Sequence, residues 1–101
     1  MLHMKNQDDK LNILFCSRLV LEKGVDILLD VIEQSLADPF LNDKIIWHIA
    51  SDGDSSYEVE NISLKSKGKV IYYGKISQLE LAELMRASDL LFMPSRFLET
   101  F

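Results

Sequence analysis

Residues 11–36 read LNILFCSRLVLEKGVDILLDVIEQSL and contain a complete strand, turn and helix pattern. The apolar run at 11–16 has the length of a β-strand, and from Val25 onward apolar residues recur three and four positions apart, as on one face of an α-helix. Two cations, Arg18 and Lys23, lie in the turn of a chain whose net charge is −5. The stretch predicts an anion site where the positive end of the helix dipole meets these cations; the alternative is two solvated surface charges.

The same rhythm continues along the rest of the chain. Apolar runs at 44–50, 69–74 and 89–93 predict three more strands, and amphipathic segments at 57–67 and 77–87 predict two more helices. The apolar residues of the run at 44–50 do not alternate with polar ones, which is typical of a parallel strand covered on both faces. The alternation predicts an α/β class: a Rossmann-like parallel sheet with helices on both faces, of about four βα units and partial.

Local signals mark where individual helices begin and end. Ser77 and Glu80 have the spacing of a capping box, and Ile76 and Leu81 fall at the two positions of a hydrophobic staple, so a helix is predicted to start there. Pro39 is predicted to close the first helix. The amphipathic stripe of the segment at 57–67 is weaker, since only three apolar positions support it: Val59, Ile62 and Leu64.

Composition narrows the class of protein. With 101 residues, 48% of them hydrophobic and 27% charged, the chain is predicted to form one domain at most. It has neither an apolar window long enough for a transmembrane helix nor a signal-peptide layout, and residues 1–10 are interpreted as a linker or an expression tail. The single Cys16 is predicted to be a buried structural thiol, and cysteine usage fits the cytoplasm. The acidic balance argues against nucleic acid as a partner.

Several common motifs fail on spacing. Asp52 and Asp54 resemble the start of a calcium loop, but Tyr57 stands where that loop needs glycine and Ser63 where it needs glutamate. His48 has no Cys or second His at ligand spacing, so it is interpreted as a core or strand-end residue. Glycine-rich dinucleotide and P-loop signatures are absent. We therefore predict no metal site.

Four sequence blocks follow the four predicted strands in order: SRLVLEKG at 17–24, SDG at 51–53, YGKIS at 73–77 and MPSRFLETF at 93–101. Together they resemble the C-terminal, donor-binding domain of the family 4 retaining glycosyltransferases, which have the GT-B architecture. The resemblance covers about residues 11–101. Each block follows a strand, where open α/β sheets bind their ligands.

The resemblance implies a donor site for a nucleoside-diphosphate-sugar (UDP-, GDP- or ADP-sugar) and no metal or other cofactor. Arg18 and Lys23 would neutralise the diphosphate, and Glu99 would lie at the donor sugar and diphosphate, so these three are the predicted catalytic residues. The predicted nucleotide-binding positions are Arg18, Lys23, Gly24, Gly53, Tyr73, Gly74 and Lys75.

The chain departs from the family pattern at identifiable places. Ser17 and Ser51 replace the usual glycines, and the second glutamate of the family motif would fall eight positions after Glu99, beyond Phe101. Asp89, which matches the aspartate that opens the fourth strand, is predicted to be structural. Residues 11–101 are thus interpreted as the N-terminal portion of a nucleotide-sugar-binding domain, truncated and inactive alone.

In the whole enzyme, the acceptor would be a glycan or a lipid bound by a missing N-terminal domain. The protein is expected in the cytoplasm, with a peripheral position at the membrane as an option for the full-length enzyme. The pathway implied is polysaccharide biosynthesis. An alternative from another class is a non-catalytic α/β module for regulation or assembly. Apolar surface left uncovered by truncation would also favour self-association.

Overall fold

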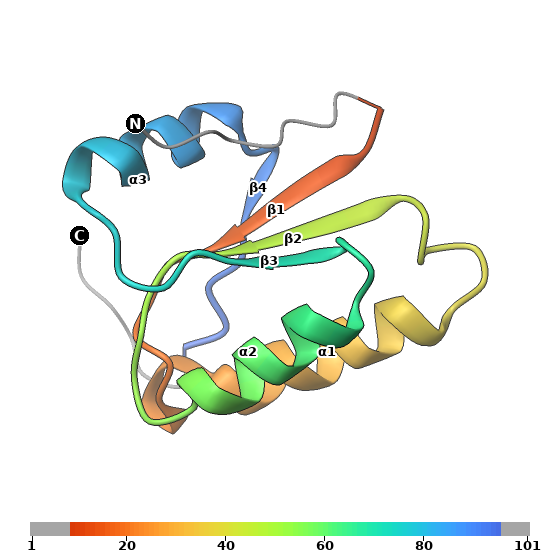
Figure 1. Ribbon diagram of the computed structural model, residues 1–101, viewed down its shortest axis with the longest axis horizontal. Helices are drawn as coiled ribbons and strands as arrows, with labels where there is room; N and C mark the ends of the chain where they lie inside the picture. Colours follow the sequence, from red (N-terminus) through yellow and green to blue (C-terminus); the bar gives the residue numbers. More distant parts are fainter. Residues whose placement is uncertain (1–8, 96–101) are drawn as a thin grey trace.

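The computed structural model describes residues 9–95, and its core is a four-stranded parallel sheet (Figure 1). Every strand and helix predicted from the sequence is present, with ends that differ by a few residues. A short 3-10 turn before the first helix was not predicted. The elements are β1 (Leu11–Phe15), η1 (Leu21–Lys23), α1 (Val25–Ala37), β2 (Ile45–Ile49), α2 (Ser56–Lys65), β3 (Val70–Tyr72), α3 (Gln78–Ala87) and β4 (Leu90–Leu91).

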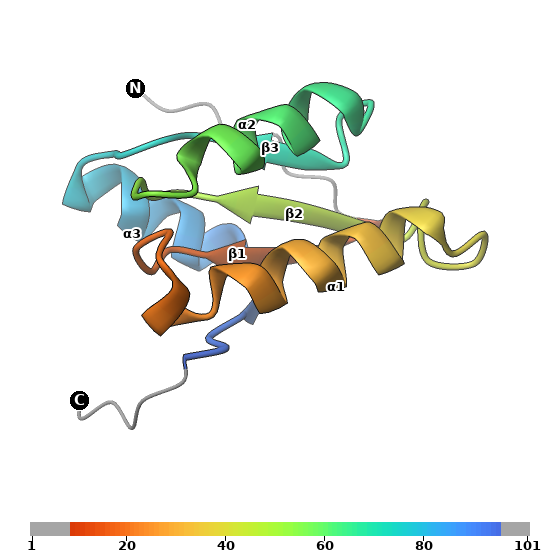
Figure 2. The same ribbon diagram turned by 90° about the horizontal axis from the view of Figure 1, so that it is seen from below.

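The strand order β3-β2-β1-β4 determines which face each helix covers. The chain steps from β1 to β2 to β3 in one direction, then returns across the sheet to place β4 beside β1. Since crossovers between parallel strands are right-handed, the reversal puts α3 on the opposite face from α1 and α2, as Figures 1 and 2 show. The order matches the first four strands of the doubly wound sheet, which confirms the predicted Rossmann-like α/β fold.

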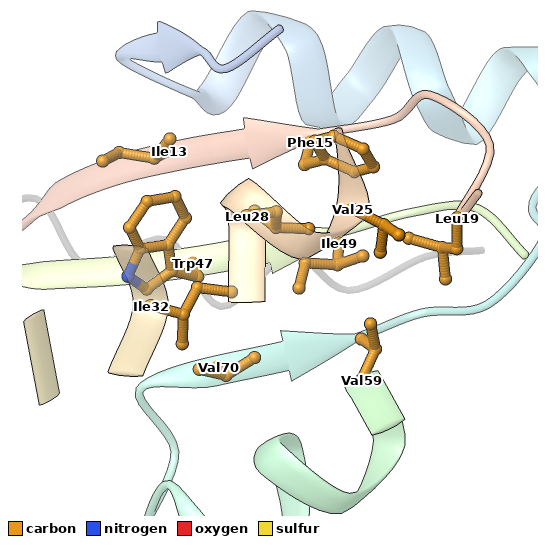
Figure 3. Packing of buried hydrophobic residues seen from close by; sticks show 10 residues of the cluster. All are labelled: Ile13, Phe15, Leu19, Val25, Leu28, Ile32, Trp47, Ile49, Val59 and Val70. Atoms are coloured by element: carbon orange, nitrogen blue, oxygen red, sulfur yellow. The ribbon is translucent and has the colours of Figure 1, made fainter. Parts of the chain in front are cut away.

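The larger part of the core lies between the sheet and the pair α1 and α2 (Figure 3). Trp47 of β2 connects the sheet to α1 and to the segment after β4. Its indole nitrogen donates to Ser35 Oγ of α1 at 3.0 Å, and its ring packs edge-on against Phe92, with centroids 5.8 Å apart. Continuous burial along β1 and β2 confirms the predicted two-sided cover. The buried residues of this cluster are Ile13, Phe15, Leu19, Val25, Leu28, Ile32, Trp47, Ile49, Val59 and Val70.

The opposite face is covered by α3, whose start follows the sequence signal. Ser77 Oγ accepts the Glu80 amide and the Glu80 carboxylate accepts the Ser77 amide, both at 3.1 Å, which confirms the capping box. Ile76 and Leu81 pack together on the smaller cluster of this face. The cap and the cluster therefore fix α3 beside the β3–α3 turn.

A diagonal row of polar side chains crosses the same face beneath α3. His48, with no exposed surface, lies between Asn12 and Tyr73: its Nε2 is 2.8 Å from Asn12 Oδ1 and its Nδ1 is 2.9 Å from the Tyr73 hydroxyl. The side-chain nitrogen of Asn12, Nδ2, donates to the Lys10 carbonyl at 3.2 Å, which turns Asn12 Oδ1 toward His48. His48 Nε2–H is thus the donor to Asn12, and Nδ1 accepts from Tyr73. This confirms His48 as a core residue.

The structure corrects two predictions, the apolar stripe of α2 and the length of the fourth strand, and it confirms the role of Asp89. Leu64 does not extend the stripe of α2, because its side chain is 77% exposed while Val59 is buried. The fourth strand is only two residues long, and it lies at the edge of the sheet with both leucines exposed. Asp89 has the structural role predicted for it, since its carboxylate accepts a hydrogen bond from the backbone N–H of Asn12 at 2.8 Å.

Among the helices of residues 9–95, none combines the length and the apolar character needed to span a bilayer.

Gly24 offers a test of how the end of β4 packs on the start of α1. Its φ is +80°, and a Cβ built there would lie 2.1 Å from the Pro94 carbonyl oxygen. Gly68 has a similar φ of +87° with nothing within 4 Å of its Cβ position. We expect Gly68→Ala to lower the free energy of unfolding by about 1 kcal/mol, for the left-handed backbone alone, and Gly24→Ala by about 2–4 kcal/mol, because steric overlap is added. Equal losses in urea unfolding would contradict the packing.

The buried imidazole predicts a pH dependence of stability. Burial lowers the pKa of His48 from 6.5 to about 4, so below pH 6.5 the unfolded chain binds a proton that the folded chain excludes. Stability should therefore fall as the pH drops from 6.5 toward 4, by about 2 kcal/mol between pH 7.5 and pH 5. The measurement is urea unfolding at both pH values.

The matched control for this prediction is His48→Gln, which retains a donor and an acceptor but does not titrate. Contributions from the carboxylates are common to both proteins and cancel in the difference. Wild-type and variant proteins with the same loss between the two pH values would show that His48 does not carry the effect.

Candidate functional site

The carboxyl ends of three strands converge on one cavity. Segments following β1, β2 and β3, together with the first turn of α3, surround a volume of about 590 Å³. This is the edge where parallel sheets bind ligands, beside the point at which the strand order reverses between β1 and β4. The lining residues are Cys16, Arg18, Ala50, Ser51, Asp52, Lys75, Ile76, Gln78 and Leu81.

A second cavity, of about 420 Å³, is also lined by Arg18. Lys23 lines it, with the acidic Glu22 and Asp54 and the apolar Val20 and Leu21. Arg18 thus borders both cavities, while Lys23 belongs to the smaller and Lys75 to the larger. Three of the predicted cations therefore lie around two neighbouring hollows at one edge of the sheet.

The loops that carry this site are fixed to each other by backbone contacts. The Leu19 amide donates to the Asp52 carbonyl at 2.9 Å, and the Leu19 carbonyl accepts the Ser55 amide at 3.0 Å. Gly53, with φ +154°, permits this approach, because a Cβ there would lie 2.7 Å from the Leu19 oxygen. Its need for glycine thus has a cause within the protein, independent of any donor.

Gly24 likewise connects two parts of the site. It is the N-cap of α1, which has no side-chain cap, and its carbonyl accepts the Leu28 amide at 2.9 Å. The chain leaving β4 lies across this point: Pro94 occupies the space that a side chain at Gly24 would need, and Ser95 Oγ is 3.4 Å from the Glu22 carbonyl oxygen. The start of α1 is therefore positioned by the segment that follows β4.

Tyr73 and Gly74 border neither of the two cavities, although Lys75 does. The Tyr73 side chain turns back under α3 to His48, and burial raises its pKa to about 12, so the hydroxyl remains protonated. Gly74 has φ +70° and open space around its Cβ position, and it carries the chain outward to the exposed Lys75. Glu99 lies outside the described residues.

Cys16 is only partly buried, which corrects the prediction of a buried structural thiol in its burial. It packs beside the cluster under α3 and also lines the larger cavity. Burial raises its pKa, so the thiol is held in the protonated, unreactive form. The sequence did not lead us to expect Cys16 in the cavity with Arg18. Its position at the carboxyl end of a strand, where such sheets bind ligands, could have indicated it.

Gln78 is another lining residue without a predicted role. It is the first residue of α3, directly after the capping serine, and its position after a strand's carboxyl end could have pointed to the site. Across residues 9–95 we find no group of three or more His, Cys, Asp and Glu side chains arranged to hold a metal ion. The charged side chains around the two cavities are thus three cations, Arg18, Lys23 and Lys75, and three carboxylates, Glu22, Asp52 and Asp54.

One known protein is similar to this chain in sequence and another in fold. The chain is 40% identical over 92 residues to an "uncharacterized 41.2 kDa protein in cps region" of Klebsiella pneumoniae, an alignment that covers 90% of this chain and 23% of the relative. The fold resembles the crystal structure of the catalytic domain of cholesterol-α-glucosyltransferase from Helicobacter pylori, with a TM-score of 0.68 and 17% identity, over 89% of this chain and 54% of that one. The chain therefore spans about a quarter of the first protein and half of the second.

The family assignment rests on the whole pattern. Residues 3–101 match the family described as glycosyl transferases group 1, a range that includes all four blocks at the carboxyl ends of the strands. The architecture of sheet and helices agrees with the glycosyltransferase domain above. This chain belongs to the group 1 glycosyltransferases.

Proposed function

We propose that this chain is the donor-binding part of a retaining, family 4-like glycosyltransferase, in which Arg18 and Lys23 bind the diphosphate of a nucleotide-sugar. The observation that carries the proposal is the position of Arg18 on the border between two cavities, with Lys23 on one and Lys75 on the other. Glu22, Asp52 and Asp54 also line these cavities, so an anionic ligand is expected to bind at Arg18, the cation that borders both of them.

The two cavities suggest how the donor lies. The smaller one, with Arg18, Lys23 and the uncapped start of α1 nearby, suits the diphosphate, since cations and helix N-termini both favour anions. The larger one suits the nucleoside, and the β3–α3 turn borders it through Lys75. Gly24 and Gly53 contribute by keeping the loops close, and Gly74 by its left-handed backbone just before Lys75.

The proposed mechanism follows from charge. When the bond to the sugar breaks, negative charge grows on the leaving diphosphate, and Arg18 and Lys23 would stabilise that charge without a metal. Each charge-assisted hydrogen bond contributes roughly 1.5–3 kcal/mol. Glu99 would act at the donor sugar, and displacement on one face, assisted by the leaving phosphate, would retain the anomeric configuration.

The acceptor is proposed to be a glycan or a lipid-linked molecule, bound by a separate N-terminal domain of the whole enzyme. The relative from a cps region supports polysaccharide biosynthesis as the setting. We place the whole protein in the cytoplasm, including the membrane periphery where the acceptor is a lipid. Self-association of the chain stays a prediction.

Nucleotide binding tests the site directly. We expect saturable amide shifts around residues 17–25 and 72–76 on titration with UDP, GDP or ADP, and the nucleotide that binds identifies the base. Arg18→Ala should weaken that binding about tenfold or more, because a charge-assisted hydrogen bond is lost.

The matched control is Arg86→Ala, which removes an exposed arginine from the last turn of α3. Similar weakening by both substitutions would show a general charge effect instead of a site. If none of the three nucleotides binds, even in a longer chain that includes the second glutamate, the non-catalytic α/β module becomes the better interpretation.

The chain alone is expected to be inactive, because an acceptor half is needed to complete the cleft. Incubation of the 101-residue chain with UDP-, GDP- and ADP-sugars should release no nucleoside diphosphate above the rate without protein. Turnover by the purified chain, retained after a second purification step and lost in Arg18→Ala, would overturn this expectation.

A further inference from the structure

We propose that His48 is a positioning residue for the donor site: by accepting the Tyr73 hydroxyl, it holds the β3–α3 turn, and so Lys75, against the larger cavity. The inference rests on the proposed function, and it assigns a role to two residues that border neither cavity.

Tyr73 is held at both its backbone and its side chain. Its amide donates to the Ile49 carbonyl at 2.8 Å, continuing the β2–β3 pairing one residue beyond β3. Its hydroxyl lies 2.9 Å from His48 Nδ1, and the two rings are nearly parallel, at 17°, with centroids 6.0 Å apart. Tyr73 is therefore the last residue before the turn that is hydrogen-bonded to the sheet, through both its backbone and its side chain.

The turn that follows has little packing of its own. Gly74 lies in the left-handed region with nothing within 4 Å of its Cβ position, and Lys75 is exposed. The next anchor is Ile76, which packs on the cluster under α3 just before the capping box begins. Residues 74 and 75 thus bridge two anchors, and Tyr73 is the anchor on the sheet side.

His48 can act as a fixed support because its own orientation is determined. Its other nitrogen donates to Asn12, whose amide nitrogen bonds the Lys10 carbonyl and whose backbone amide bonds the Asp89 carboxylate. These contacts extend from the far end of the sheet to the carboxyl edge, across β1 and β2. A side chain buried completely and bonded at both ring nitrogens has no alternative orientation within the network.

A ligand-binding split tests the role. In the 101-residue chain, Tyr73→Phe should raise the Kd of the nucleotide that binds best about fivefold, the effect of one lost hydrogen bond. It should change the Kd of inorganic pyrophosphate by less than about twofold, because Arg18 and Lys23 are untouched. A merely structural role would affect both ligands equally or neither.

The chain supplies a matched control one residue away. Tyr72→Phe makes the same chemical change on the opposite face of β3, where Tyr72 packs against the cluster under α1 and α2. It should leave both Kd values unchanged. His48→Gln, which can accept from Tyr73 and donate to Asn12, should stay close to wild type, while His48→Leu should reproduce the effect of Tyr73→Phe.

Amide hydrogen exchange at residues 74 and 75 gives a second readout without ligand: it should quicken in Tyr73→Phe and not in Tyr72→Phe. Unchanged nucleotide affinity in Tyr73→Phe, while the wild-type chain binds nucleotide, would overturn the positioning role and leave the proposed function intact. A wild-type protein that binds neither nucleotide nor pyrophosphate, even in a longer chain that includes the second glutamate, would overturn the proposed function, and the positioning role with it.

Discussion

The pairing of β1 with strands on both its sides is the constraint on which the rest of this structure depends. β1 pairs with β2 over five positions, from Leu11 with Ile45 to Phe15 with Ile49, and with β4 on its other edge. Because its neighbours are reached by crossovers in opposite directions, the helices must divide between the two faces. The same division creates the reversal of strand order, and the loop that leaves β1 at this reversal carries Arg18.

Backbone contacts, more than side-chain salt bridges, shape the site. The loop after β1 is joined to the loop after β2 through both polar groups of Leu19, and glycines at positions 24 and 53 allow backbone to approach where a Cβ would overlap. An exposed ion pair such as Lys69 with Asp43, at 3.0 Å, contributes little by comparison. The charges at the site are thus presented by loops whose paths are already fixed, which lowers the ordering cost of binding an anion.

The row of polar side chains under α3, Asn12, His48 and Tyr73, places a buried imidazole in the core. An imidazole buried this completely costs free energy unless it is hydrogen-bonded, and both of its nitrogens are. Across residues 9–95, no buried side-chain nitrogen or oxygen lacks a hydrogen-bond partner. An apolar residue at position 48 would leave Asn12 Oδ1 and the Tyr73 hydroxyl without these hydrogen bonds, so the histidine contributes to polar satisfaction under α3 as well as to packing.

The sequence by itself determined those features that depend on neighbours a few residues apart. Apolar period separated strands from helices, the Ser77 and Glu80 pair marked the start of α3, and the order of four short blocks indicated the family and the edge of the sheet that carries the cations. It failed at Leu64, because a weak stripe does not state where the core ends, and at Cys16, because burial at a strand end depends on what covers it.

Only the tertiary structure decided which distant segments meet. Strand order placed α3 on the face opposite α1 and α2 and brought Lys75 into the cavity of Arg18, 57 positions earlier in the sequence. It also turned Tyr73 toward His48 and away from the cavities, a direction that the alternation of side chains along β3 determines only once the faces are known. Local rules state what each segment forms, but strand pairing between segments far apart in the chain decides which side chains share a site.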